Sequence, residues 1–593
     1  MTELLAPVGV HLALFLPYVV ISLVSPDAVR ESKVLAQGLA SALVLLGLAF
    51  DTLANGRGSE RVRLPRLLAV TSLGAAAFVA ASVIRGLFSW TDPLVLAPLG
   101  TAAALFAIGA SRRGAAIGSR AFVVLAFAGA LTGLLAALQR MAGIFLLPIE
   151  GADVRYRTVA LLGSPGDVGA ALVLPAVILA AGLMDVASSR ASRALHLAGL
   201  GLVLMGLASA ETLTSLAAVV VGIAAFSAFE LRRRGPVLAG LAVAGLLALL
   251  AVGATARFGE IAEFLRQKSI SKAVTERDIG FRASVEMLRA RPLLGEGPGN
   301  FSNAFIPARL RAEQRVGRRL VHSSTSAHFE NAHNEWLTFA AECGLPAALL
   351  ASVAVGSLLL YLARRRSDTL FSLLVSLAVL GFASFPSRLA VVAGPGALVL
   401  GLAFRSVIEE TSPAPAPTVN RRWKAIGLAA VALLLASLAT ARGLAVLRQA
   451  EGEAALQAAA VAPLADRPYL LELARTALRQ SVSLRSRFAT AWLALGSTYR
   501  LDRNLEAAHA ALETSLALEE RAETDLNLGR VEFETGNHEA AMALFRRAIW
   551  ILPRLRLSLP PEVDGHELER EVGAVEAELP RGGSPPPLRP LRP

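Results

Sequence analysis

Long apolar runs recur along the chain and strongly limit what it can fold into. Each has about 17 to 21 residues, the length that an α-helix needs to cross ~30 Å of hydrocarbon. With 54% hydrophobic residues in 593, the composition is that of an integral membrane protein. The sequence therefore predicts an all-α polytopic membrane protein with about thirteen spanning helices, near residues 4–24, 34–52, 67–84, 94–110, 121–139, 168–187, 195–210, 213–230, 236–256, 345–363, 370–385, 388–407 and 424–442.

Arginine clusters lie in alternate loops between these runs. The net charge is +12, but the cations are dispersed instead of gathered on one soluble face, which argues against a nucleic-acid partner. Cytoplasmic loops carry such an excess of basic residues and face anionic lipid. The N-terminus is thus predicted to be cytoplasmic. The clusters are Arg57, Arg61, Arg63 and Arg66; Arg112, Arg113 and Arg120; Arg190 and Arg193; Arg232 to Arg234; Arg364 to Arg366; and Arg421, Arg422 and Lys424.

This orientation places the long loop 257–344 and the tail on the outer side of the membrane. The first run has no basic n-region or A-x-A cleavage site, so we expect a retained helix instead of a signal peptide. The predicted domains are N-terminal membrane helices at 1–256, the outer loop at 257–344, C-terminal membrane helices at 345–442, a helical repeat region at 443–560 and a Pro-rich disordered tail at 561–593.

The tail carries the spacing of tetratricopeptide repeats, which are stacked pairs of helices. A degenerate repeat with Ala474 and Leu478 precedes two clear ones. Because stacked helix pairs form a concave groove, the region is a candidate binding surface for a periplasmic protein. The clear repeats contain Trp492, Leu495, Gly496, Tyr499, Ala508 and Leu512, and then Leu528, Gly529, Gly536, Ala541, Phe545, Ala548 and Pro553.

Common hydrolase, metal and nucleotide motifs do not occur. The one cysteine, Cys343, allows neither an intramolecular disulfide nor a thiolate cluster. His328 and His333 are five residues apart, which suits a helical metal pair poorly, and no H-E-x-x-H, G-x-S-x-G or P-loop is present. We therefore predict no metal site and no cofactor.

A histidine and several arginines lie on the predicted outer side. Arg155 and Arg157 precede the sixth run, Arg282 lies in the long loop, and His333 precedes the tenth run. Guanidinium groups bind phosphate through paired hydrogen bonds. Imidazole is suited to accept the proton of a hydroxyl nucleophile near neutral pH. The pattern favours group transfer from a phosphorylated lipid at the outer face.

Two segments carry a family resemblance: "RPLLGEGPGNF" at 291–301 and "NAHNEWLTFAAECGLP" at 331–346. Together they resemble the paired signature of the O-antigen ligase and polymerase superfamily of bacterial membrane glycosyltransferases. The resemblance implies a polytopic inner-membrane enzyme with a large periplasmic loop. It also implies an undecaprenyl-diphosphate-linked glycan as donor, without a nucleotide sugar or a metal.

Roles carry over from this resemblance to individual residues. His333 resembles the catalytic base, and Arg157 and Arg282 resemble the arginines that bind the diphosphate, with Arg155 competing with Arg157. Asn334 follows the histidine as the family pattern expects and is assigned to substrate binding. Glu342 either orients His333 or is a charge at a helix end. Many members have a histidine where this chain has Asn331, so that role would be lost or would fall on His328 or His322.

The resemblance implies an inverting transfer of a glycan to a hydroxyl acceptor such as lipid A core, as in an O-antigen ligase. Two related alternatives stay open: a polymerase that uses a second lipid-linked repeat unit, and a protein O-oligosaccharyltransferase. A lipid-linked glycan transporter is a rival of another class. Transporters place charges within their helices and show repeat symmetry, and neither is evident in these runs.

Overall fold

The computed structural model describes residues 2–585, except 21–25, 56–61, 90, 112, 146–157, 186–187, 235–276, 322–327 and 411–420. Ten helices within these residues are long and apolar enough to cross a membrane. The only strands in this part of the chain are two residues each, Val62–Arg63 and Glu409–Glu410, paired antiparallel. The prediction of an all-α, multi-pass membrane protein is confirmed.

The predicted spans correspond closely to these helices. The first predicted run and the run 370–385 form shorter apolar helices, Leu5–Val19 and Asp368–Gly381. The predicted run 236–256 lies outside the described residues. The run 424–442 is only the first part of a longer helix, which continues to Val461 because good helix formers follow and the first proline is Pro463.

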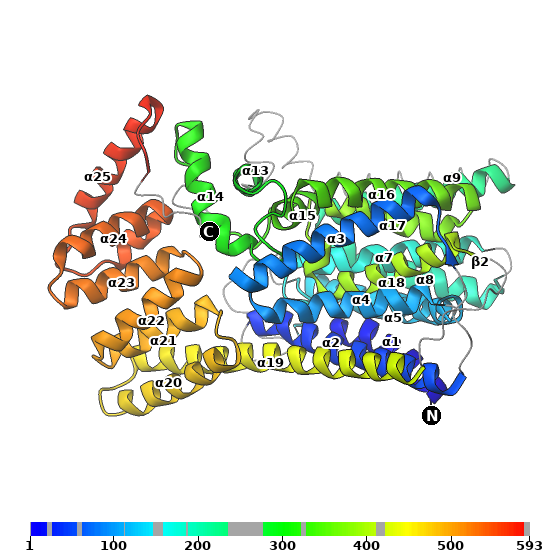
Figure 1. Ribbon diagram of the computed structural model, residues 1–593, viewed down its shortest axis with the longest axis horizontal. Coiled ribbons are helices and arrows are strands. Elements are labelled where there is room, and N and C mark those ends of the chain that lie inside the picture. The colour runs from blue at the N-terminus through cyan, green and yellow to red at the C-terminus, as the bar shows by residue number, and fades with distance from the viewer. Residues whose placement is uncertain are drawn as a thin grey trace. The chain divides into compact units, whose positions relative to one another are not determined.

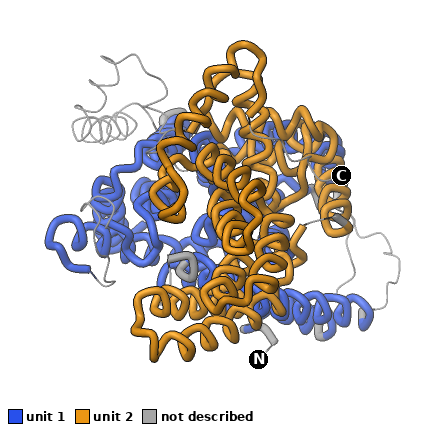
Figure 2. The backbone as a smooth tube through the Cα atoms, turned by 90° about the vertical axis from the view of Figure 1, so that its left-hand side faces the viewer, with its two compact units in different colours: residues 1–73, 96–268, 350–443 blue, residues 74–95, 269–349, 444–593 orange. Residues whose placement is uncertain are grey.

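The chain divides into two compact units (Figure 2). The first contains residues 1–73, 96–268 and 350–443, and the second contains 74–95, 269–349 and 444–593. The second unit thus combines three segments that are far apart in the sequence. It holds both family motifs and the C-terminal helices.

The first unit is a bundle of apolar helices (Figure 1). Three helices are divided between the two units. They are α3 (Arg66–Ser89), α16 (Leu345–Arg365) and α19 (Arg421–Val461). Its other elements are α1 (Thr2–Val19), α2 (Pro26–Asn55), β1 (Val62–Arg63), α4 (Leu96–Ala110), α5 (Gly114–Ala142), α7 (Pro165–Met184), α8 (Arg190–Ala210), α9 (Leu213–Arg234), α17 (Asp368–Gly381), the 3₁₀ turn η2 (Pro386–Arg388), α18 (Ala390–Val407) and β2 (Glu409–Glu410).

Helix α7 lies at the centre of this bundle. Most of its residues are buried, and the buried hydroxyl of Tyr18 donates to the carbonyl of Ala171 at 3.0 Å. Small residues let neighbouring helices approach closely, as is usual in membranes. At Gly206 of α8, an added Cβ would lie 2.5 Å from the Cα of Gly133 in α5. Packing at this crossing therefore depends on the missing side chain.

Gly206→Ala should destabilise the bundle, because overpacking a close helix contact costs about 1–3 kcal/mol. Gly201→Ala is the matched control on the same helix, since an added Cβ there meets nothing within 4 Å. The measurement is the thermal unfolding midpoint of each purified variant in detergent. Equal midpoints for the two variants would contradict the packing assignment.

The second unit consists of shorter helices. Those near the family motifs are η1 (Pro93–Val95), α13 (Arg277–Ala290), α14 (Phe301–Val316) and α15 (Glu335–Cys343). The C-terminal array follows the end of α19 with α20 (Arg467–Leu484), α21 (Ala489–Leu501), α22 (Leu505–Leu518), α23 (Ala522–Glu534), α24 (His538–Ile551), η3 (Pro553–Ser558), α25 (Gly565–Glu578) and η4 (Leu579–Arg581).

The array begins with helical hairpins that repeat one internal contact, and Figure 1 shows them stacked in chain order. A Cβ on Gly496 of α21 would lie 2.6 Å from the side chain of Leu512 in α22. Gly452, near the end of α19, meets Leu478 of α20 in the same way at 2.5 Å. Thus the end of α19 is the first helix of the first hairpin. Whether these hairpins are tetratricopeptide repeats stays a prediction.

Candidate functional site

His333 lies in a tight turn that precedes α15. The side-chain oxygen of Asn331 accepts the backbone N–H of His333 at 2.9 Å, and Asn334 caps the helix by accepting the N–H of Leu337 at 2.9 Å. His333 itself has a φ of 51°, in the left-handed region that is costly for most side chains. A strained residue held by its neighbours is typical of functional sites. The turn therefore fixes the backbone from which the imidazole projects.

Helix α13 packs directly against this turn. An added Cβ at Gly280 would come within 3.2 Å of the Cα of Ala332, which is fully buried. This contact and the chain geometry hold the Cα atoms of Arg282 and His333 within about 14 Å of each other. The Arg282 side chain is 42% exposed, with its Nε 3.7 Å from Asp278. A half-exposed guanidinium on a fixed helix can take up an anionic ligand.

The two family motifs are joined by backbone hydrogen bonds. The N–H of Glu296 donates to the carbonyl of Ala341 at 2.9 Å, and the N–H of Gly297 donates to that of Glu342 at 2.8 Å. Gly295 has a φ of 63°, and a Cβ there would collide with the Glu342 carbonyl group. Only glycine combines this conformation with this approach. The motif glycines thus join the two loops.

The last turns of α3 hold the same loop from another side. Ser82 donates to the carbonyls of Leu294 at 2.7 Å and Glu342 at 3.0 Å, and Arg85 donates to the carbonyl of Gly295 at 2.7 Å. Sequence reasoning missed both residues. In the sequence, these two polar residues are three positions apart near the end of a largely apolar helix, and that pattern could have indicated them.

Glu342 lies at the far end of α15 from His333. The helix between them rises by about 10 Å. One carboxylate oxygen of Glu342 accepts the backbone N–H of Phe301 at 3.3 Å, at the start of α14. This carboxylate therefore lies at the N-terminal end of α14, where the helix dipole favours a negative charge. This contact supports the reading of Glu342 as a helix-end charge, and its role in orienting His333 stays a prediction.

Glu296 is buried at the centre of several arginines. Its carboxylate lies 3.3 Å from the Nε of Arg291. Burial raises the pKa of Glu296 to about 7, although the charges of Arg85 and Arg311 act in the opposite direction. The group can therefore change its charge near neutral pH, next to the loop that joins the motifs.

The structure says less about the other predicted site residues. Arg155 and Arg157 lie outside the described residues, as does His322. The Asn334 side-chain oxygen is used by the helix cap, so its substrate role stays a prediction. Among the described residues, no group of three or more His, Cys, Asp or Glu side chains is arranged to hold a metal ion.

Residues 198–352 match the family model described as O-antigen ligase. This part of the chain is an O-antigen ligase domain. The match includes α13, α14, α15 and both motifs, so the resemblance predicted from the sequence is confirmed. No curated protein matches the chain.

The O-antigen ligase domain should be less stable at alkaline pH because of Glu296. The folded state keeps the proton up to a pKa of about 7, whereas the unfolded chain releases it near 4.5. The resulting stabilisation is complete below pH 4.5 and is lost as pH rises through 7. This difference corresponds to about 3 kcal/mol.

Glu296→Gln should remove this part of the pH dependence, because a neutral amide does not titrate. The measurement is the thermal unfolding midpoint of wild type and variant between about pH 5 and pH 8. We expect the variant to gain stability relative to wild type as pH rises. Parallel curves for the two proteins would show that Glu296 is ionised in both the folded and the unfolded states.

Proposed function

We propose that the protein transfers a glycan from undecaprenyl diphosphate to a hydroxyl acceptor at the outer face of the bacterial inner membrane. The observation that carries the proposal is the fixed turn at His333 within an O-antigen ligase domain, packed against the helix that bears Arg282. A lipid-linked donor is held in the bilayer, where a multi-pass membrane protein such as this chain can bind it.

In the proposed reaction the neutral imidazole of His333 takes the proton of the acceptor hydroxyl. The oxygen then attacks the anomeric carbon of the donor sugar. A new glycosidic bond forms as the bond between that carbon and the diphosphate oxygen breaks. Undecaprenyl diphosphate leaves with the bonding electron pair, and the anomeric configuration inverts.

Arginines stabilise the leaving group as negative charge develops on it. Arg282 is the described candidate, and Arg157 or Arg155 is assigned as its partner from the family resemblance. A guanidinium keeps its charge and can bind two phosphate oxygens at once. Preorganised cations of this kind typically supply several kcal/mol to the transition state.

The acceptor is assigned as a lipid A core hydroxyl, because the matching family is described as O-antigen ligase. A polymerase would use the same base and arginines with a second lipid-linked repeat unit as acceptor. The two differ in what accumulates on undecaprenyl diphosphate when the enzyme fails. The glycan that accumulates therefore distinguishes a ligase from a polymerase.

His333→Ala should abolish glycan transfer without changing the amount of folded protein, because the variant lacks the base. The assay follows transfer from lipid-linked glycan extracted from a strain that lacks the protein, with purified wild type or variant in detergent. Wild-type activity in His333→Ala would overturn the proposed mechanism.

Arg282→Ala should lower kcat/KM for the lipid-linked donor by roughly 100-fold, because removing one positioned donor to a developing charge typically costs that much. Arg318→Ala is the matched control, since Arg318 is exposed and lies in the same loop region. An equal loss in both variants would remove Arg282 from the donor site.

Mass spectrometry of the glycan on undecaprenyl diphosphate should distinguish ligase from polymerase. In a null strain that carries His333→Ala, we expect long chains to accumulate, because polymerisation continues while the final transfer is blocked. The same strain with wild type is the control. Accumulation of single repeat units would assign the protein as a polymerase.

A further inference from the structure

The last helices of the C-terminal array share a hydrophobic core with the O-antigen ligase domain. One cluster of buried residues contains Ile279 of α13, Phe305 of α14 and Ala332 beside His333, together with Phe545 and Trp550 of α24. The earlier hairpins of the array have a separate hydrophobic cluster. The last helices of the array are therefore part of the folded unit that holds the candidate site.

His328 forms a direct contact between the array and the segment that leads to His333. Its Nε2 lies 2.7 Å from the Oε1 of Glu519, and both side chains are largely buried. The guanidinium of Arg521 holds the same oxygen at 3.0 Å. Burial raises the pKa of Glu519, but the charges of Arg521 and His328 outweigh it and lower that pKa to about 2. The carboxylate is therefore a fixed anion at this contact.

A row of edge-to-face ring contacts leads from His328 to His333. The centroids of His328 and Phe305 are 5.9 Å apart, those of Phe305 and Phe329 are 5.1 Å apart, and those of Phe329 and His333 are 5.7 Å apart. Such perpendicular pairs are a favoured geometry of aromatic side chains. The orientation of the His333 ring therefore depends on the position of His328.

The second ring of this row, Phe305, is itself held in place by the array. Phe305 belongs to α14, and the indole N–H of Trp550 donates to Glu313 of the same helix at 2.9 Å. The guanidinium of Arg309, also in α14, donates to the carbonyl of Ile551 at 3.2 Å. All of these side chains are buried. Helix α14 thus cannot move away from α24 without breaking hydrogen bonds to two buried charged groups.

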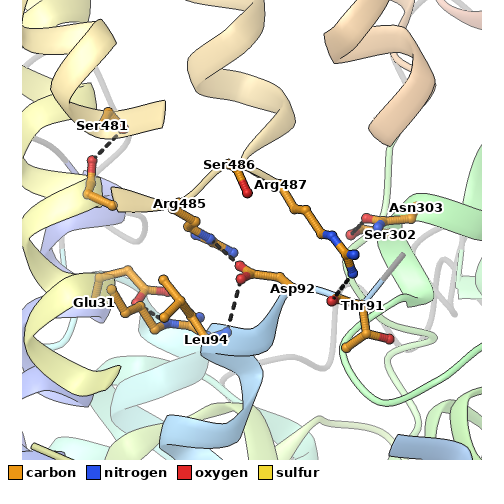
Figure 3. A network of polar contacts seen from close by, with 12 residues as sticks. Glu31, Thr91, Asp92, Leu94, Ser302, Asn303, Ser481, Arg485, Ser486 and Arg487 are labelled. Carbon is orange, nitrogen blue, oxygen red and sulfur yellow. Dashed lines mark hydrogen bonds and ion pairs between the residues drawn. The ribbon is translucent and has the colours of Figure 1, made fainter. Parts of the chain in front are cut away.

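The array also contacts the turn after α3 (Figure 3). Arg485 forms an ion pair with Asp92, and Arg487 donates to the carbonyl of Thr91 at 2.5 Å. The side chain of Thr91 in turn accepts a hydrogen bond from Asn300 at 2.5 Å, at the end of the first motif. The array therefore holds the first motif through Thr91 and the second through His328.

We propose that His328 and Glu519 are positioning residues for His333, so that the C-terminal array orders the catalytic turn. The inference rests on the proposed role of His333 as the base. Removing the contact would let the 328–334 segment and its ring contacts shift, and misplacement of a base by about 1 Å can cost up to 100-fold in rate. Substrate binding through the arginines would be unaffected.

The test compares three variants of the full-length protein in the glycan-transfer assay. His328→Leu should lower kcat on the order of tenfold with KM for the lipid-linked donor unchanged. His328→Gln should recover part of kcat, because its amide can still donate to Glu519 and hold the segment, although the ring contact with Phe305 is lost. His509→Leu is the matched control, since His509 Nε2 contacts Glu532 at 2.8 Å within the array but takes no part in the ring contacts that lead to His333.

Activity is expressed per amount of folded protein, measured by size-exclusion chromatography and thermal unfolding. If His328→Leu does not fold, Glu519→Ala takes its place, because it removes the acceptor, and it should show the same fall in kcat at constant KM. Wild-type kcat in the variant measured would overturn the inference. An equal fall in His509→Leu, or no recovery in His328→Gln, would overturn it as well.

Failure of the proposed function has a different signature. It would appear as an inactive wild type or as an active His333→Ala, whatever the result at position 328. A fall in kcat that occurs only in His328→Leu, with wild type active and His333→Ala inactive, supports both proposals together.

Discussion

Two backbone hydrogen bonds form the contact on which the rest of the candidate site depends. They join Glu296 and Gly297 to the carbonyls of Ala341 and Glu342, at the end of α15. Helix α14 begins directly after this junction, and α15 leads from it back to His333. The glycines of both motifs are needed because a Cβ would separate the two loops. The glycines of the two motifs are therefore needed to form the fold of the site.

Around this junction the domain buries charge instead of excluding it. Glu296 lies beside Arg291, Glu342 faces the first N–H of α14, and Arg309 and Glu313 are fully buried in α14. Buried charges add little net stability, but removing one partner is costly. Such a network permits few alternative packings. It suits a site that must hold a strained histidine in one geometry.

The C-terminal array changes how the tail is understood. Its spacing predicts a surface for a protein partner. Its last helices, however, complete the hydrophobic core of the domain, and two of its earlier loops contact Thr91 and His328 beside the motifs. A truncation at the start of the array would therefore expose this core and release His328. Loss of activity in such a truncation would not by itself indicate a lost partner.

The sequence by itself determined the membrane class, most helix positions, the family and the identity of His333 as the candidate base. These follow from apolar runs and from short motifs, which are local properties of the chain. It did not reveal Ser82, Arg85, Glu519 or the contact that His328 makes with Glu519, because each acts through a residue distant in the sequence. Only the tertiary structure decided that α3, α13 and the array meet at one site, since such contacts arise from packing between segments that no local pattern connects.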